Sequence, residues 1–202
     1  MQPPSLVVDH GSLLTLDQFL AEFRTAWSRL RSRFLKLETW QSYQELAANV
    51  SQEAFRQGDL DRVRRLLREE AEGDRPLYQD VKQRGLDYAR IRLIKEPLTD
   101  YLRYELMSYQ IRAEMGEPIV VVRTDPATPL PNADLFDLLL FDRETALVHD
   151  YGTAEVGAQT GGWLVRDREI IEELERRVLA LREQAVPLHR YLAESQSPGL
   201  AG

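Results

Sequence analysis

The sequence predicts an α+β fold with a helical amino-terminal region, a central mixed sheet of four or five strands and a long carboxyl-terminal helix. Over residues 15–85 apolar side chains recur at intervals of three and four, the period of amphipathic helices. Over residues 86–166 they alternate with polar residues or form short β-branched runs, which is typical of strands. The helical period returns over residues 167–192. We therefore expect a single domain over residues 15–192 with a helical cap, a sheet and a closing helix.

Four helices are expected in the amino-terminal part, over residues 15–30, 45–57, 60–72 and 76–84. Gly73 and Pro76 separate the last two, because glycine and proline both disfavour a helix interior. A short apolar patch at residues 34–37 is expected to be extended. Residues 1–14 and 193–202 contain proline, glycine and serine, so we expect both ends to be flexible.

Five strands are expected, over residues 87–95, 119–123, 138–141, 146–151 and 163–166. In the first of them apolar and polar residues alternate, so Arg90 and Arg92 share one face of the strand. Pro97 ends this strand, and Thr99 is a candidate cap for the helix that follows. Asp167 is the expected cap of the closing helix.

The composition narrows the classes of function. The 202 residues hold 26 basic and 33 acidic side chains, a formal net charge of −7, with no cysteine and three histidines. This acidic balance disfavours nucleic-acid binding, which usually needs a basic face. The lack of cysteine excludes disulfides and thiolate metal sites and fits a reducing compartment. Because no stretch approaches the roughly 18 apolar residues of a membrane helix and the start lacks signal-peptide features, we expect a cytoplasmic protein, without metal or cofactor.

The best candidate site lies where a strand meets the following helix. Arg90 and Arg92 project from one face of the strand, and Glu96 follows at its end. Tyr101 and Glu105 are four residues apart on the helix, so they share a helix face. An arginine together with carboxylates and a phenol can hold a polar ligand, and this junction is a common place for one.

Two interpretations of this cluster stay open. In the first, these residues form a ligand site, with Arg90 and Glu38 as its outer members. In the second, the whole set is an internal ion-pair network that locks the helix against the sheet. His149 is not expected to be catalytic, because its neighbour Asp150 points to the opposite face of the strand and cannot orient it.

The closing helix carries a narrow apolar seam. Ile171, Leu174, Val178 and Leu181 recur at intervals of 3, 4 and 3 residues, the spacing of a coiled-coil contact. One interpretation is packing on the protein's own sheet. The other is homodimerisation, or docking of a partner helix.

Three strings resemble an uncharacterised actinobacterial domain family. They are residues 34–43 (FLKLETWQSY), 89–106 (ARIRLIKEPLTDYLRYEL) and 134–142 (DLFDLLLFD). The resemblance covers residues 30–192, and the string Glu-Pro-Leu-Thr-Asp-Tyr is its most specific part. It implies a genomic context near helix-turn-helix regulators and hence a regulatory partner. The chain departs from the family pattern at Leu135, Asp137 and Leu138, where members carry an aromatic pair.

A second resemblance concerns the fold. The order of a hairpin, the string Gly-Gly-Trp-Leu-Val-Arg-Asp at residues 161–167 and a long helix is similar to the last part of phospholipase-D-like sensor domains attached to some transcription regulators. Active members of that superfamily need a His-x-Lys pair. Here His149 is followed by Asp150 and Tyr151, so the resemblance implies a fold without that catalysis.

These observations together predict a non-catalytic regulatory or interaction module that binds a polar ligand or a protein partner such as a helix-turn-helix regulator. The alternative is an enzyme that uses the same Glu, Arg and Tyr side chains on a small molecule or nucleic acid, with the carboxylates as acid and base. Direct DNA binding is a third class, which the net charge disfavours.

Overall fold

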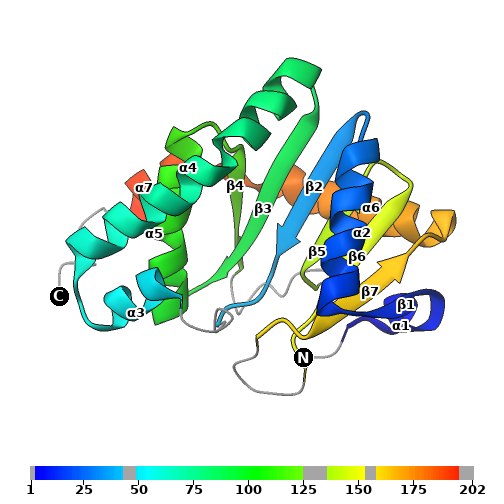
Figure 1. Ribbon diagram of the computed structural model, residues 1–202, viewed down its shortest axis with the longest axis horizontal. Coiled ribbons are helices and arrows are strands. Elements are labelled where there is room, and N and C mark those ends of the chain that lie inside the picture. The colour runs from blue at the N-terminus through cyan, green and yellow to red at the C-terminus, as the bar shows by residue number, and fades with distance from the viewer. Residues whose placement is uncertain (1–2, 43–48, 125–135, 153–157, 196–202) are drawn as a thin grey trace.

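The structure is a computed structural model that describes residues 3–42, 49–124, 136–152 and 158–195. Figure 1 shows its helices and strands arranged around one twisted sheet. The elements follow along the chain as α1 (Ser5–His10), β1 (Ser12–Thr15), α2 (Leu16–Arg29), β2 (Arg33–Glu38), α3 (Val50–Arg56), α4 (Leu60–Arg84), β3 (Asp87–Lys95), α5 (Asp100–Glu114), β4 (Ile119–Thr124), β5 (Leu138–Phe141), β6 (Thr145–Asp150), β7 (Gly161–Val165), α6 (Arg168–Gln184), β8 (Val186–Pro187) and α7 (Leu188–Ser195).

The sheet is mixed. Within the described ranges it has eight strands in the order β1-β7-β6-β5-β2-β3-β4-β8. Strands β2, β3 and β4 are parallel, and the other neighbouring pairs are antiparallel. The predicted α+β class is confirmed, but the predicted four or five strands are too few. Strands β1 and β8 are short segments that extend only because they pair at the sheet edges, and β2 occupies the centre of the sheet.

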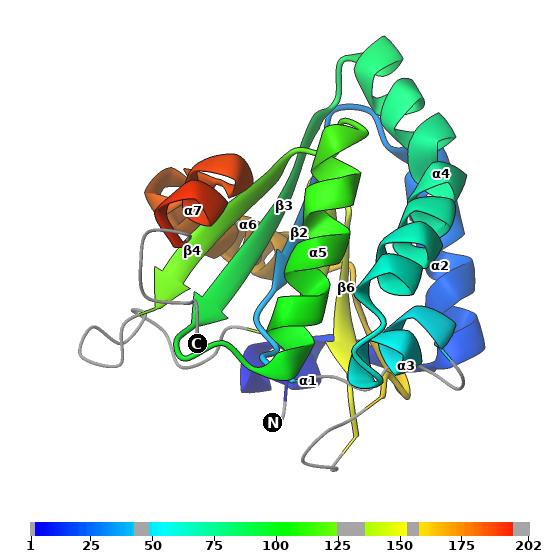
Figure 2. The same cartoon turned by 90° about the vertical axis from the view of Figure 1, so that its left-hand side faces the viewer.

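The sheet is covered on both faces, as Figure 2 shows. Helix α6 packs on one face, against side chains such as Leu35, Leu37 and Ile91. Helices α2, α4 and α5 cover the opposite face. Because successive side chains of a strand point to opposite faces, the polar residues that alternate with this apolar set lie beneath α4 and α5. That face holds the candidate site.

The apolar seam of α6 faces the protein's own sheet. Ile171, Leu174, Val178 and Leu181 are each at most 3% exposed and belong to the core that α6 shares with the sheet. The packing interpretation therefore accounts for them. A homodimer through these four residues is incompatible with this packing, since none of the four presents its side chain at the surface.

Three expectations about helix boundaries need correction. Helix α4 runs without a break through Pro76, where two helices were expected. A proline inside a helix removes one hydrogen bond and bends the axis, and here buried residues on both sides, Ala71 and Tyr78, hold the two halves in place. The expected flexible start contains α1 and β1, and the closing segment is two helices joined by β8.

Other boundaries agree with the sequence analysis. The Thr99 side chain accepts a hydrogen bond from the Leu102 N–H (3.1 Å), and Asp167 accepts one from the Glu169 N–H (2.9 Å), so both predicted caps are confirmed. Helix α3 begins at Val50, and residues 43–48, where its start was expected, lie outside the described ranges. No helix among the described residues has the length and apolar character needed to cross a bilayer.

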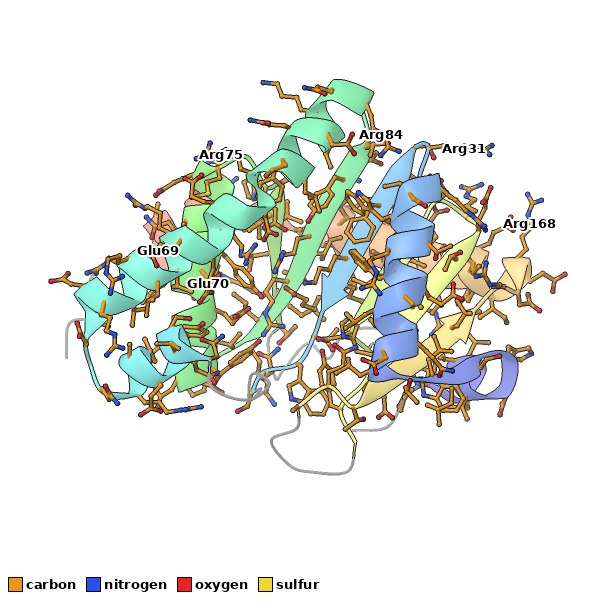
Figure 3. All side chains as sticks on the ribbon, in the orientation of Figure 1. Arg31, Glu69, Glu70, Arg75, Arg84 and Arg168 are labelled. Carbon is orange, nitrogen blue, oxygen red and sulfur yellow. The ribbon has the colours of Figure 1, made fainter. Side chains whose placement is uncertain are left out.

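Helix α4 is amphipathic. Glu69 and Arg75 lie on its outer side (Figure 3), and each pairs with a charge one turn away on the same helix. Arg84, at the end of the helix, pairs with Asp80 and also donates to the carbonyl oxygen of Leu30. These pairs give α4 a charged outer face. Such exposed pairs contribute little to stability, so the opposite, sheet-facing side positions the helix.

Glycines at the start of β7 let α2 approach the sheet. A Cβ at Gly162 would lie 2.5 Å from the ring of Phe19 and 2.4 Å from the carbonyl oxygen of Val148. Any larger residue would therefore push α2 away from β6 and β7. Phe19 fills this close contact and is 2% exposed.

Asp142 ties the β5–β6 turn to the entrance of β2. Its Oδ1 accepts hydrogen bonds from the N–H groups of Ser32 (2.9 Å) and Arg33 (2.8 Å), and its Oδ2 accepts one from the Arg31 N–H (2.9 Å). Asp142 itself has a φ of 51°, a left-handed conformation that Asp and Asn tolerate better than most residues. Burial alone would raise the pKa of Asp142, but these donors hold it below its usual value.

We expect Asp142→Ala to lower the free energy of unfolding by roughly 2–4 kcal/mol, because three backbone donors lose a charged acceptor and alanine fits the left-handed conformation poorly. Urea unfolding of the purified variant measures this. Asp142→Asn is the matched control, since it keeps one acceptor oxygen and the backbone tolerance. An alanine variant no less stable than the asparagine variant would contradict the assignment.

Candidate functional site

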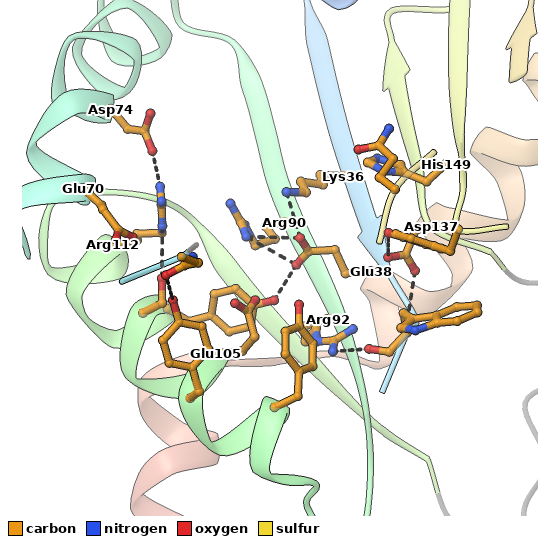
Figure 4. A pocket seen from close by; sticks show the side chains of 18 residues that line it. Lys36, Glu38, Glu70, Asp74, Arg90, Arg92, Glu105, Arg112, Asp137 and His149 are labelled. Atoms are coloured by element: carbon orange, nitrogen blue, oxygen red, sulfur yellow. Dashed lines mark hydrogen bonds and ion pairs between the residues drawn. The ribbon is translucent and has the colours of Figure 1, made fainter. Parts of the chain in front are cut away.

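A polar cavity of about 410 Å³ lies between the sheet and helices α4 and α5 (Figure 4). Its lining is mostly charged or hydrogen-bonding, with tyrosines on the α5 side. The lining residues are Lys36, Glu38, Trp40, Asn49, Glu70, Asp74, Arg90, Arg92, Tyr101, Tyr104, Glu105, Ser108, Tyr109, Arg112, Asp137, His149, Tyr151 and Gln159. We call this space the polar cavity.

Strand alternation supplies the floor of the polar cavity. Lys36 and Glu38 point into it from β2, Arg90 and Arg92 from β3, and His149 from β6. All five are on the face opposite α6. They are side by side because β2 pairs with β3 in parallel register, with Lys36 beside Arg90 and Glu38 beside Arg92.

Arg90 is neutralised by two carboxylates. Its Nε donates to Glu117 Oε1 at 2.8 Å, and its Nη1 is 3.2 Å from Glu38 Oε1. Glu117 follows the end of α5, is 3% exposed, and also accepts hydrogen bonds from Tyr78 (2.9 Å) and Tyr88 (2.7 Å). Burial would raise the pKa of Glu117, but the Arg90 charge and the two phenols keep it below its usual value. Glu117 is therefore a buried anion.

Glu38 and Glu105 have opposite pKa shifts. Burial opposes the ionisation of Glu38, but the charges of Arg90 and Lys36 outweigh it, and the pKa of Glu38 is held well below its usual range. Lys36 Nζ is 2.8 Å from Glu38, and Tyr109 donates to Glu38 at 2.7 Å. Burial and the nearby charge of Glu38 raise the pKa of Glu105, against a hydrogen bond from Tyr109. Of these two carboxyl groups, Glu38 is held in its anionic form, and Glu105 has the higher proton affinity.

Arg92 is the least compensated cation of the site. Its side chain is 1% exposed and donates through Nη2 to the carbonyl oxygen of Trp40. Its Nε has no hydrogen-bond partner among the residues that the structure describes. Lys36, Arg90 and Arg112 each form an ion pair with a carboxylate, whereas Arg92 forms none within the described ranges. A buried guanidinium donor without a protein partner is available to a ligand or a water molecule in the cavity.

His149 lies at the opposite end of the floor between two rings. Its ring centroid is 5.0 Å from that of Phe19 and 5.8 Å from that of Tyr151, with which it is nearly parallel. Its Nδ1 is buried and lacks a partner within the described part of the chain. Burial lowers the pKa of His149 to about 4, against the nearby charge of Asp137. The imidazole is therefore neutral at pH 7.

Asp137 organises the loop beside His149. Its Oδ1 accepts hydrogen bonds from the Thr39 N–H (2.5 Å) and the Trp40 N–H (3.1 Å), and its Oδ2 accepts one from Tyr151 (2.7 Å). Asp137 therefore positions the backbone at Trp40, whose carbonyl oxygen accepts a hydrogen bond from Arg92.

Five of the six sequence-predicted site residues line the polar cavity. They are Glu38, Arg90, Arg92, Tyr101 and Glu105. Glu96 does not line it. The chain turns at Pro97 toward α5, so the Glu96 side chain is exposed beyond the end of β3.

Sequence reasoning missed Lys36, Asp137 and His149, and it missed Glu117 beneath Arg90. The position of Lys36 could have been predicted, because it alternates with apolar residues in β2 as Arg90 does in β3. His149 was set aside because Asp150 points away, and Asp150 indeed does not line the cavity. The described residues contain no cluster of three or more His, Asp or Glu side chains arranged to hold a metal ion.

A family model covers most of the chain, matching residues 21–193. The chain belongs to the family described as Domain of unknown function (DUF6879). This supports the prediction of an uncharacterised domain family. A comparison with curated proteins finds no significant match.

The chain is also similar to two solved structures. One is a phospholipase D family member, Nuc from Salmonella typhimurium, with 10% identity and a TM-score of 0.47, covering 83% of this chain and 89% of that one. The other is NucT from Helicobacter pylori, with 10% identity and a TM-score of 0.48, covering 88% of this chain and 98% of that one. These two matches contradict the prediction of a non-catalytic regulatory module, which is withdrawn.

We expect Glu117→Gln to lower the free energy of unfolding by roughly 3–5 kcal/mol, because it leaves the buried Arg90 with only part of its counter-charge. Urea unfolding at pH 7 measures the loss. The matched control is Glu114→Gln, an exposed glutamate at the end of α5. Equal stability of the two variants would show that Glu117 does not compensate Arg90.

The free energy of unfolding should also decrease when the pH is lowered, because of His149. Its folded-state pKa, about 4, lies below the ordinary value of 6.5, so the unfolded chain binds the proton first as the pH falls. The contribution of His149 to the free energy of unfolding is complete above pH 6.5 and decreases by about 3 kcal/mol as the pH is lowered to 4. Urea unfolding across this range should show a smaller decline in His149→Gln than in the control His189→Gln, whose side chain is exposed. Parallel curves for the two variants would contradict the shift.

Proposed function

We propose that the protein is an enzyme that acts on a small organic anion in the polar cavity, with Arg92 binding the anionic group and Glu105 transferring a proton. The observation that carries this proposal is a buried guanidinium, with an unused Nε donor and no ion-pair partner in the described chain, facing a cavity that Glu38 and Glu105 also line. The proposal replaces the module interpretation and retains the sequence-predicted Glu, Arg and Tyr set.

Arg92 suits the anion-binding role because it stays charged. Burial opposes its charge, but the neighbouring phenol of Tyr109 and the carboxylate of Glu38 raise its pKa above the usual value. A guanidinium binds the oxygens of a carboxylate or phosphate in a fixed planar geometry. Its strong burial excludes water, which strengthens this contact.

Glu105 suits the proton-transfer role because its neighbours separate its ionisation from that of Glu38. Two carboxyl groups with opposite pKa shifts in one site support an assignment of one as the fixed anion and the other as the acid or base. Tyr109 hydrogen-bonds Glu38 and lies beside Glu105, so its hydroxyl links the two. A raised pKa brings Glu105 closer to the working pH, where proton transfer is most effective.

The alternative of a purely structural ion-pair network accounts for only part of the cluster. It explains Arg90, which Glu38 and Glu117 neutralise, and Arg112, which pairs with Asp74. It gives no role to the Nε of Arg92 or to the Nδ1 of His149, neither of which has a hydrogen-bond partner among the described residues. A ligand that reaches both groups would satisfy both.

The size of the cavity favours a small molecule over a polymer. A volume of about 410 Å³ falls within the range of roughly 300–1,000 Å³ typical of small-molecule sites. The net charge of −7 also opposes the approach of a nucleic acid.

Incubation with a mixed extract of cellular small molecules tests the proposal. We expect mass spectrometry to show at least one anionic compound consumed by the wild type, with a loss of at least roughly 100-fold in rate for Glu105→Gln, the size typical of removing a general acid or base. The rate should follow an ionisation above the ordinary pKa of glutamate.

Glu114→Gln, on the same helix but outside the polar cavity, is the control and should retain the activity. Consumption of no compound, or equal consumption by Glu105→Gln and the wild type, would contradict the proposal.

A further inference from the structure

A second, apolar cavity lies beside the first. It has a volume of about 270 Å³ and lies between α2 and α4, which are separated over β2 and β3 in Figure 1. Its apolar walls are the side chains of Phe19, Leu20, Phe23, Trp27, Phe34 and Leu77. We call it the aromatic groove.

The aromatic groove adjoins the polar cavity. Six side chains line both spaces, namely Lys36, Asp74, Arg90, Arg112, His149 and Gln159. The boundary between the two therefore consists of side chains that face both ways. A molecule in the polar cavity next to Lys36 or His149 is also next to the aromatic groove.

The walls of the aromatic groove are suited to a flat ring. Phe23 and Trp27 are half-buried, and their rings are nearly parallel, with an interplanar angle of 8° and centroids 6.1 Å apart. Across the groove, Leu77 of α4 is also half-buried. Exposed aromatic surface of this kind gains stability when another ring covers it.

We propose that the substrate is an aromatic anion whose charged group binds Arg92 in the polar cavity and whose ring occupies the aromatic groove. This inference rests on the proposed function and names the substrate class of the same site. The unused donor of Arg92 specifies the anionic end, and the half-buried rings next to the shared boundary specify the aromatic end. Either a carboxylate or a phosphate satisfies Arg92, so both are included in the test.

Isothermal titration calorimetry with two matched pairs of probes tests the inference. In the sheet register Arg92 lies beside Glu38, four residues along β2 from the Phe34 wall of the groove, so the probes need a spacer between anion and ring. One pair is 4-phenylbutyrate and butyrate, and the other is 4-phenylbutyl phosphate and butyl phosphate. In each pair the aromatic member has a phenyl ring where its partner has a hydrogen. Burying a phenyl ring in the groove should make the aromatic member bind at least roughly tenfold tighter than its partner in the wild-type protein. The pair that binds more tightly identifies the anionic group.

Leu77→Trp should fill the aromatic groove and remove the preference for the ring without weakening the binding of the small anion. Leu60→Trp is the matched control, because Leu60 is an exposed residue on the same helix, away from both cavities. Circular dichroism checks that both variants are folded. A ring preference lost in Leu77→Trp and kept in Leu60→Trp supports the inference.

Two results overturn it in distinguishable ways. Binding of butyrate or butyl phosphate without a preference for the ring, or a preference that persists in Leu77→Trp, shows that the aromatic groove does not hold the substrate and leaves the anion site of Arg92 standing. Failure of all four probes to bind shows that the proposed anion site is wrong, and the inference about the ring with it.

Discussion

The need to neutralise a buried arginine fixes the arrangement of this fold. Arg90 is in a strand covered on both faces, and its side chain is 9% exposed, so its charge must be balanced within the protein. Glu117 arrives from the end of α5 and Glu38 from the neighbouring strand β2. These two carboxylates therefore tie a helix and two strands to one point. The tyrosines that hydrogen-bond Glu117 extend the same connection to α4 and β3.

The same charge arrangement separates structure from function within the site. Where cation and carboxylate match, as at Arg90, the groups hold the fold together. Where they do not match, as at Arg92, a buried positive charge is left without an ion-pair partner among the described residues. Arg92 lies two residues beyond Arg90 on the same face of β3. The ion pairs of Arg90 therefore stabilise the strand that presents Arg92 to the polar cavity. Glu105 faces both regions from α5, which explains why its ionisation responds to the carboxylate of Glu38.

Local patterns in the sequence predicted most of the elements, and five of the six candidate residues named from them line the polar cavity. Alternation placed Arg90 and Arg92 on one face, and the helical period placed Tyr101 and Glu105 together. Glu117 and His149 escaped prediction because their positions depend on which strands are neighbours, and strand order is a long-range property. Strands β1 and β8 were missed for the same reason, since pairing with β7 and β4 makes them extended. Pro76 was predicted to end a helix, but α4 continues through it because packing against the sheet outweighs the local preference of proline.

The two edges of the sheet are short. Strand β1 has four residues, and β8 has two, one of which is Pro187. A proline has no N–H to offer to another strand, and a four-residue edge presents few unpaired groups. The long apolar central strands are thereby kept away from the edges at which chains of different molecules join. The arrangement protects the protein against edge-to-edge aggregation. These two short strands therefore contribute to its solubility and take no part in the polar cavity.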